Sequence, residues 1–251
     1  MPRTAMPSTK LRLDQLLVAR GLCESREKAQ RAIMAGDVTV GEQRIDKPGT
    51  RVLEDALVTV KQADRYVGRG GLKLEAALRD FAIDPAGATC LDIGASTGGF
   101  TDCLLQHGAA KVWAIDVGHS QLDWKIRSDP RVVVREKLNA RHLTRSDIPD
   151  PIPICVIDVS FISLTLILPP AMALLSDGGV IVPLIKPQFE LRKEDVGRGV
   201  VRDAALHAQA VEKIRAFATG TLGLVWSGCI ESPILGGEGN REFLACLHAS
   251  A

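Results

Sequence analysis

TCLDIGASTGGF, residues 89–100, is the stretch of the sequence that decides the fold. Leu91 and Ile93 lie in an apolar run that predicts a buried strand, and the glycines after it predict a turn. Phe100 then begins an apolar pattern of helical period that continues through Leu104. A strand, a glycine turn and a helix in this order form the first unit of a doubly wound α/β sheet.

The glycine turn also predicts a ligand site, because glycine lets the backbone approach a ligand and the helix N-terminus behind it offers free N–H groups. A second predicted strand, 112–115, ends in Asp116, an acid about twenty residues on, where a ribose diol is commonly held. The spacing G-x-x-x-G-G departs from the pyrophosphate fingerprint G-x-G-x-x-G. This departure favours S-adenosylmethionine, which carries no phosphate. The residues predicted to contact the cofactor are Asp92, Gly94, Ala95, Ser96, Thr97, Gly98, Gly99, Asp116, Asn139 and Asp158.

Length and charge indicate two domains of different character. The chain has 251 residues, enough for one large α/β domain and a small module, and 46% hydrophobic residues, as in ordinary globular proteins. Residues 1–79 hold 15 Lys/Arg and 10 Asp/Glu, a net charge of +5, whereas the remainder holds 16 and 20, a net charge of −4. The basic N-terminal third favours nucleic-acid binding, although a solvated protein surface can be mildly basic by chance.

The cysteines and apolar segments indicate a cytoplasmic protein without a bound metal. Six cysteines are scattered without a C-x-x-C pair, which predicts buried, reduced thiols and no zinc site. The N-terminal ten residues lack the apolar stretch of a secretory signal. Prolines and glycines split Leu164–Ile185 into a predicted helix and strand, each too short to cross a bilayer. The three tryptophans, Trp113, Trp124 and Trp226, are expected in the core.

The N-terminal segment resembles the S4 RNA-binding module. Residues 12–20 predict one helix, Ser25 is a predicted cap of a second, and strands are predicted around 38–40 and 57–60. Such modules present a basic helix pair to folded RNA, chiefly through phosphate contacts. The residues assigned to RNA binding are Arg12, Arg20, Arg26, Lys28, Arg31 and, after the module, Arg69. Arg12-Leu13-Asp14 also resembles the R-L-D of pseudouridine synthases, but it lies within the first predicted helix, so no catalytic role is predicted for Asp14.

The rest of the chain completes a predicted parallel sheet. Further strands are predicted at 131–134, 154–157, 180–185, 222–230 and 242–247, with a helix over 204–219. Ligands bind at the carboxyl ends of parallel strands, and every polar candidate is predicted to lie at such an end: Asp92, Asp116, Asn139, Asp158 and Lys186. This coincidence favours an enzyme over a purely structural protein.

The chain resembles the TlyA (haemolysin A) family of S4-containing RNA methyltransferases in the motifs GGLKLE, DIGASTGGFTD, VIDVSFISL, IKPQFE and VRD with GNREF. The resemblance implies an S4 domain over 10–62, a linker over 63–69 and a Rossmann-like, FtsJ-like methyltransferase domain with a mostly parallel seven-stranded sheet over 70–250. Arg65-Tyr66-Val67 stands where the family has a tryptophan in R-x-W-V. The implied activity is S-adenosylmethionine-dependent 2′-O-methylation of cytidine in 16S or 23S ribosomal RNA, or in both.

The resemblance also implies a catalytic tetrad of Lys73, Asp158, Lys186 and Glu242. Lys186 is our hypothesis for the general base, with Lys73 as a neighbouring cation and the two carboxylates orienting the amines. Each position also has an alternative interpretation: Lys186 as a solvated lysine at a strand exit, Lys73 as a surface helix lysine, and Glu242 as a partner of Arg241.

Rival functions can be compared with the same motifs. Methylation of a base amine usually requires Asn/Asp-Pro-Pro after the fourth strand, and methylation of a pyrimidine carbon requires a cysteine there; DVSF has neither. Two alternatives come from other classes: a pore-forming haemolysin and a non-catalytic rRNA-binding assembly factor. The polar segment Gln188–Asp203, with Gly197 and Gly199, is either a lid or a plain surface loop.

Overall fold

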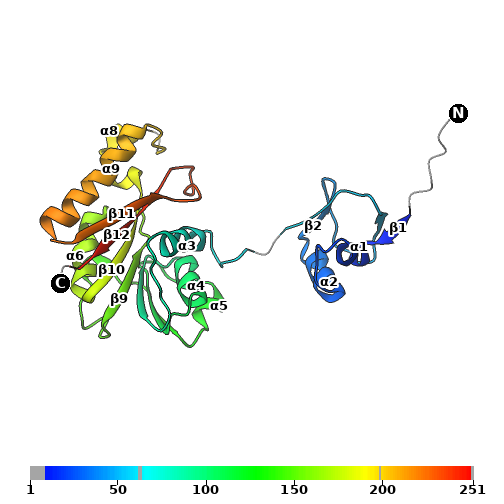
Figure 1. Ribbon diagram of the computed structural model, residues 1–251, viewed down its shortest axis with the longest axis horizontal. Coiled ribbons are helices and arrows are strands. Elements are labelled where there is room, and N and C mark those ends of the chain that lie inside the picture. The colour runs from blue at the N-terminus through cyan, green and yellow to red at the C-terminus, as the bar shows by residue number, and fades with distance from the viewer. Residues whose placement is uncertain (1–8, 62–63, 198, 250–251) are drawn as a thin grey trace. The chain divides into compact units, whose positions relative to one another are not determined.

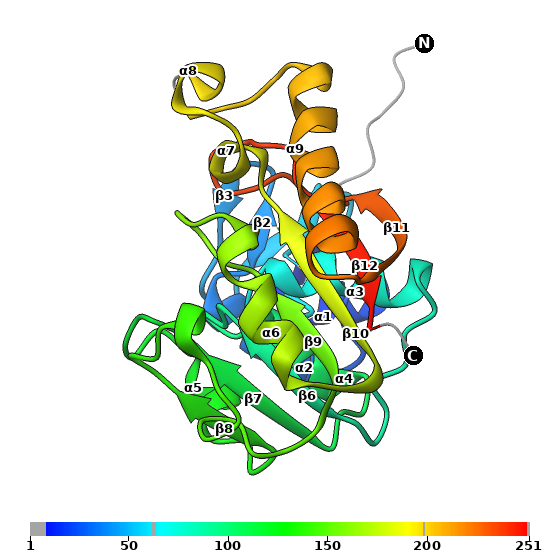
Figure 2. The same cartoon turned by 90° about the vertical axis from the view of Figure 1, so that its left-hand side faces the viewer.

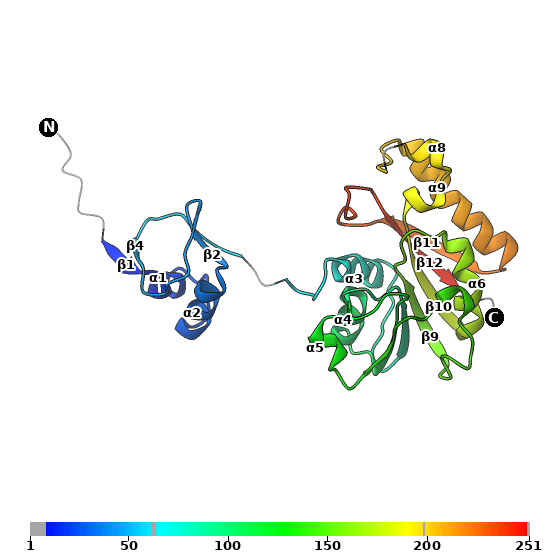
Figure 3. The same ribbon diagram turned by 180° about the vertical axis from the view of Figure 1, so that it is seen from behind.

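The computed structural model describes residues 9–61, 64–197 and 199–249. The chain folds as two compact units that divide between residues 63 and 64 (Figure 1). The first unit is small and carries α1 and α2, which can be followed in Figure 3, and the second carries the large sheet. Arg198 and residue 63 of the expected linker lie outside the described residues.

The first unit packs two helices against short strands. Its elements are β1 (Lys10–Arg12), α1 (Leu13–Ala19), α2 (Arg26–Ala35), β2 (Val38–Val40), β3 (Gln43–Arg44), β4 (Arg51–Leu53) and β5 (Val58–Val60). Ser25 caps α2 by accepting a hydrogen bond from the Lys28 amide, and Gly36 ends it in the left-handed conformation, as the sequence predicts. Arg12 differs from the prediction, because it pairs with Arg51 in an antiparallel ladder and precedes the helix.

The second unit is built on a seven-stranded, mostly parallel sheet, which confirms the predicted fold class. Its strands are β6 (Thr89–Ile93), β7 (Lys111–Ile115), β8 (Val132–Arg135), β9 (Ile152–Ile157), β10 (Leu175–Ile185), β11 (Val225–Glu231) and β12 (Phe243–His248). Their order is β11-β12-β10-β9-β6-β7-β8. β12 runs antiparallel to both of its neighbours, so its N-terminal end lies at the same edge of the sheet as the C-terminal end of β10.

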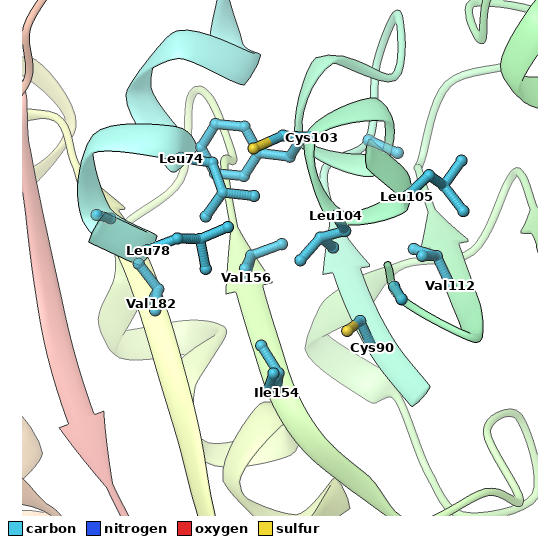
Figure 4. Packing of buried hydrophobic residues seen from close by; sticks show 14 of the residues in the cluster. Leu74, Leu78, Cys90, Cys103, Leu104, Leu105, Val112, Ile154, Val156 and Val182 are labelled. Carbon is cyan, nitrogen blue, oxygen red and sulfur yellow. The ribbon is translucent and has the colours of Figure 1, made fainter. Parts of the chain in front are cut away.

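Helices cover both faces of this sheet. The helices of this unit are α3 (Gly70–Asp80), α4 (Gly99–Gln106), α5 (Trp124–Arg127), α6 (Leu168–Leu174), α7 (Pro187–Glu190), α8 (Lys193–Val196) and α9 (Ala204–Ala216), with short helical turns η1 (Ala140–His142), η2 (Leu164–Leu166) and η3 (Phe217–Thr221). Leu74 and Leu78 of α3 and Leu104 of α4 pack on Val156 and Val182 of one face (Figure 4). The α6 and α9 helices cover the other face (Figure 2).

Some details differ from the sequence predictions. Trp124 is 76% exposed on the short helix α5, so its predicted place in the core is wrong, whereas Trp113 is buried. All six cysteines are free, and four of them are buried. Leu164–Ile185 does contain a helix and a strand, α6 and β10, as predicted. Among the described residues, no helix is long and apolar enough to cross a membrane.

Candidate functional site

The predicted catalytic residues meet at one edge of the large sheet. Asp158 directly follows β9, Lys186 directly follows β10, and Glu242 directly precedes β12. The last pair of the β10–β12 ladder is Ile185 with Phe243, so Lys186 and Glu242 occupy the next position of the same ladder. The sequence alone could not place these residues together, because the antiparallel insertion of β12 is what brings Glu242 to the carboxyl edge.

Two ion pairs connect the four side chains. Nζ of Lys73 lies 2.5 Å from Oε2 of Glu242, and both side chains are buried. Nζ of Lys186 lies 2.6 Å from Oδ1 of Asp158 and donates a hydrogen bond to Oγ of Ser160. The start of α3, which carries Lys73, packs against Asp158, because a Cβ at Gly70 would lie 3.8 Å from Oδ2 of Asp158.

Each lysine is therefore matched by one carboxylate, and the two pairs come from four different elements. Such an arrangement holds two amines at fixed positions without leaving a buried charge unpaired. An ammonium so placed can orient a hydroxyl group, and the free amine form of the same side chain can take its proton. Among the described residues, no group of three or more histidine, cysteine or acidic side chains is arranged to hold a metal ion.

Two adjoining cavities open beside the tetrad and share Gly94, Ser96, Asp158 and Ser160 as lining residues. The larger, about 460 Å³, extends along Asp116, Leu138 and Asn139. The smaller, about 180 Å³, is bounded by Thr97 and Gly99 of the glycine turn and by Lys186. Eight of the ten residues predicted to contact a cofactor line one cavity or the other; the larger cavity has the size expected for a small-molecule site.

Asp116 lines the larger cavity and binds two backbone amides of the neighbouring loops. Its Oδ2 accepts a hydrogen bond of 2.8 Å from the Ser96 amide, and its Oδ1 accepts one of 2.6 Å from the Gly118 amide. Asn139 caps the short turn η1 by accepting from the Arg141 amide. Each carboxylate oxygen has further acceptor capacity, so Asp116 can still receive hydroxyl donors from a ligand.

Asp92 of β6 and Gly98 of the glycine turn, the other two predicted cofactor residues, line neither cavity. Asp92 is fully buried and accepts a hydrogen bond of 2.6 Å from Thr101, while its Oδ1 has no hydrogen-bond partner among the described residues. Burial raises the pKa of Asp92 to about 7. At Gly98 a side chain would contact Leu122 and Ile126. Both residues therefore make contacts inside the protein and not at a cavity wall.

Gly94 allows the backbone after β6 to lie very close to the backbone of Asp158. Its φ is +88°, and a Cβ there would lie 2.2 Å from the backbone oxygen of Asp158. We predict that Gly94→Ala lowers the free energy of unfolding of the second unit by about 2–4 kcal/mol, because the added methyl must push β6 from the chain after β9. Urea unfolding measures the loss.

Gly87 provides the matched control for this prediction. Its φ is +73°, but a Cβ there meets nothing within 4 Å. Gly87→Ala therefore carries the same backbone strain without the collision, and we expect a loss of about 1 kcal/mol. Equal losses in the two variants would contradict the steric explanation.

The predicted RNA-binding residues of the first unit lie on or beside its helix pair. Arg20 donates to the backbone oxygens of Glu54 and Ala56, and Lys28 pairs with Glu24. Arg12 and Arg26 both contact Asp14, and Arg31 is exposed. Arg69, in the second unit, is exposed immediately before α3.

Several residues of the site are absent from the sequence prediction. Ser160 contacts Lys186, and Val117, Leu138 and Ala140 give the larger cavity its apolar lining. Phe161 is 91% exposed at the cavity, with a φ of +63° that is unusual outside glycine. The signal was present in the motif VSF, where an aromatic residue follows a strand end, but exposure cannot be deduced from the motif.

Two loops of the site are braced by buried polar side chains. Glu190 of α7 accepts hydrogen bonds from Ser163 and from the Leu164 amide, and it pairs with Lys213 of α9. Asn240 accepts from the Val201 amide and donates to the Gly199 backbone oxygen. Asn240 therefore anchors the end of Gln188–Asp203, whose role as lid or surface loop stays open.

The linker residues pack on the second unit. Tyr66 is buried against Gly71, where a Cβ would lie 2.2 Å from the tyrosine ring. The Val67 amide donates to Asp102, and Gln106 donates to the Arg65 backbone oxygen. The second glycine of the GGLKLE motif thus makes room for the aromatic ring.

Two family models match the chain: the FtsJ-like methyltransferase model over residues 66–249 and the S4 domain model over 11–58. A Bacillus subtilis protein named "Putative rRNA methyltransferase YqxC" is 52% identical, with 97% of this chain and 87% of that protein covered. The Mycobacterium tuberculosis protein named "16S/23S rRNA (cytidine-2'-O)-methyltransferase TlyA" is 46% identical, with 95% and 90% covered. A solved structure described as "Putative hemolysin from Streptococcus thermophilus" is 46% identical, with a TM-score of 0.74 and coverage of 98% and 90%.

Proposed function

Because the chain belongs to the FtsJ-like methyltransferase family and carries an S4 domain before the catalytic domain, we propose that it methylates the 2′-hydroxyl of cytidine in ribosomal RNA. The observation that supports this most directly is the pairing of Lys73 with Glu242 and of Lys186 with Asp158 at one edge of the sheet, with Asp158 and Lys186 lining the smaller cavity. The names of the relatives support the choice of substrate. A ribosomal RNA substrate and free cysteines agree with action in the cytoplasm.

S-adenosylmethionine is the proposed cofactor, and the larger cavity fits its adenosine part. Asp116 would hold the ribose hydroxyls, and Leu138 and Asn139 would border the adenine. The glycine turn would cradle the remainder of the cofactor along Gly94, Thr97 and Gly99. When bound, the cofactor supplies a methyl group on a positively charged sulfur.

The protein's own contribution is to position the ribose and to remove a proton. We assign Lys186 as the group that, as the free amine, accepts the 2′-hydroxyl proton at Nζ and becomes an ammonium paired with Asp158, because it alone of the two lysines lines the smaller cavity among the described residues. Asp158 and Ser160 hold that Nζ in place. Lys73, fixed by Glu242, is the neighbouring cation that stabilises negative charge developing on the oxygen.

The RNA-binding surface is proposed to lie mainly in the first unit. We assign residues 10–62 to the S4 domain, 63–69 to the linker and 70–250 to the methyltransferase domain. Arg12, Arg20, Arg26, Lys28 and Arg31 would contact phosphates, with Arg69 adding a contact beside the catalytic domain. Exposed Phe161, which lines the larger cavity, is suited to stack on a nucleotide base.

The function is tested by incubating the purified protein with unmodified ribosomal RNA and subunits and S-adenosylmethionine. We expect one methyl group on the ribose of a defined cytidine, mapped by mass spectrometry of nuclease fragments, and binding of the cofactor measured by calorimetry. Methylation of a base, or none on either subunit or free RNA, would contradict the proposal. Dye release from vesicles, measured on the same preparation, tests the pore-forming alternative.

A further inference from the structure

Asp14 in the first unit is the centre of a hydrogen-bond network that the proposed RNA contacts do not by themselves explain. Its side chain is 0% exposed, although it lies in the first turn of α1. It accepts hydrogen bonds of 3.0 Å from Nε and Nη2 of Arg12, from Nε of Arg26, from the side chain of Gln30 and from the backbone amide of Gln15. One buried carboxylate thus joins β1, α1 and α2.

The two arginines remain accessible despite these bonds. The Arg12 side chain is 40% exposed and the Arg26 side chain is 53% exposed. A guanidinium carries five N–H groups, so Asp14 uses two of those on Arg12 and one of those on Arg26. Among the residues that the structure describes, the other N–H groups of both side chains form no hydrogen bond, so they can donate to another acceptor.

The Arg12 guanidinium also holds the pKa of the Asp14 carboxyl well below its usual range. The carboxylate therefore stays ionised at neutral pH and keeps both arginines bound. An arginine held in one geometry loses little further side-chain freedom when it binds a phosphate. A free arginine loses this freedom at the moment of binding.

We propose that Asp14 is a positioning residue for RNA, which holds Arg12 and Arg26 as a preformed pair of phosphate-binding groups. The inference rests on the proposed RNA-binding role of the first unit. The change in RNA affinity that it predicts is opposite in sign to the usual effect of removing an acidic residue. RNA repels carboxylates, so removing an acidic residue near the binding surface ordinarily strengthens binding, whereas removing Asp14 should weaken it.

Asp46 offers a matched control in the same unit. It is an exposed aspartate in the loop between β3 and β4, and its side chain has no ion-pair partner among the described residues. Asp46→Asn removes the same charge as Asp14→Asn without freeing an arginine. Comparing the two variants distinguishes the effect of the lost charge from the effect of the lost arginine positioning.

The experiment measures binding of the full chain to purified ribosomal RNA at several salt concentrations. We expect Asp14→Asn to weaken binding about tenfold and to lower the salt dependence, because fewer phosphates are contacted. Asp46→Asn should leave binding unchanged or strengthen it about twofold. An Asp14→Asn variant that binds as tightly as Asp46→Asn overturns the proposal.

A double-variant background excludes a merely structural role. In Arg12→Gln/Arg26→Gln, no arginine remains to be positioned, so Asp14→Asn should cause no further loss of affinity. A further tenfold loss there means that Asp14 acts through the fold of the unit, which also overturns the proposal. The readout is binding alone: a chain that binds RNA without methylating it would contradict the proposed function and leave this inference standing.

Discussion

Lys186→Ala is expected to lower the rate of methyl transfer about a thousandfold or more, because it removes the proposed proton acceptor and the group that orients the ribose. Lys186 lines the smaller cavity, whereas Asp116 and Asn139, which are proposed to hold the adenosine part of the cofactor, line the larger one. The affinity for S-adenosylmethionine should therefore change less than about threefold. Single-turnover transfer to ribosomal RNA and calorimetry of cofactor binding measure the two effects separately.

Lys186→Arg distinguishes proton transfer from charge. Arginine can keep the ion pair with Asp158 but stays protonated in proteins, so it cannot accept the hydroxyl proton. We expect this variant to be nearly as inactive as the alanine variant; substantial activity would assign Lys186 an electrostatic role instead. Lys111→Ala is the control, since Lys111 is also paired with an aspartate, Asp150, but begins β7 at the opposite edge of the sheet.

The fold could be predicted because its signals are local. The apolar run before Gly94 and the helical period after it predict β6 and α4 without reference to the rest of the chain. What the sequence could not give is the position of β12, which inserts between β10 and β11 in an antiparallel direction. Strand order depends on contacts between segments far apart in the sequence, and no local pattern specifies it.

Some residues of the candidate site could likewise be predicted from the local sequence, and others could not. Asp116 and Asp158 were predicted from their place after apolar strands, and both line the cavities. The assignment of Lys73 came from family resemblance alone, because a lysine within an amphipathic helix looks like a surface residue until its partner Glu242 is placed. Trp124 shows the converse error: a large apolar residue suggests a core position, yet the short α5 leaves it exposed.

The buried pair of Lys73 and Glu242 is expected to dominate the stability of the site. The Lys73 side chain is 10% exposed and that of Glu242 is 3% exposed, so neither charge is well solvated if its partner is lost. We predict that Glu242→Ala lowers the free energy of unfolding of the second unit by about 3–5 kcal/mol and abolishes methyl transfer. Glu231→Ala, which removes a half-exposed partner of Arg241 on the adjacent strand, should cost at most about 1 kcal/mol.

A variant that regains the free energy of unfolding but lacks both charges shows whether Lys73 and Glu242 are needed for catalysis. In Lys73→Met/Glu242→Met both charges are replaced by flexible apolar side chains, and replacement of a whole buried pair is often neutral or stabilising. We expect the double variant to regain most of the unfolding free energy lost in Glu242→Ala, yet to remain inactive in methyl transfer while still binding S-adenosylmethionine. Since a folded, cofactor-binding protein would then lack only the fixed cation and its carboxylate, the inactivity could not be attributed to unfolding. A double variant that recovers methylation along with stability would make the pair a structural element and leave catalysis to Lys186 and Asp158.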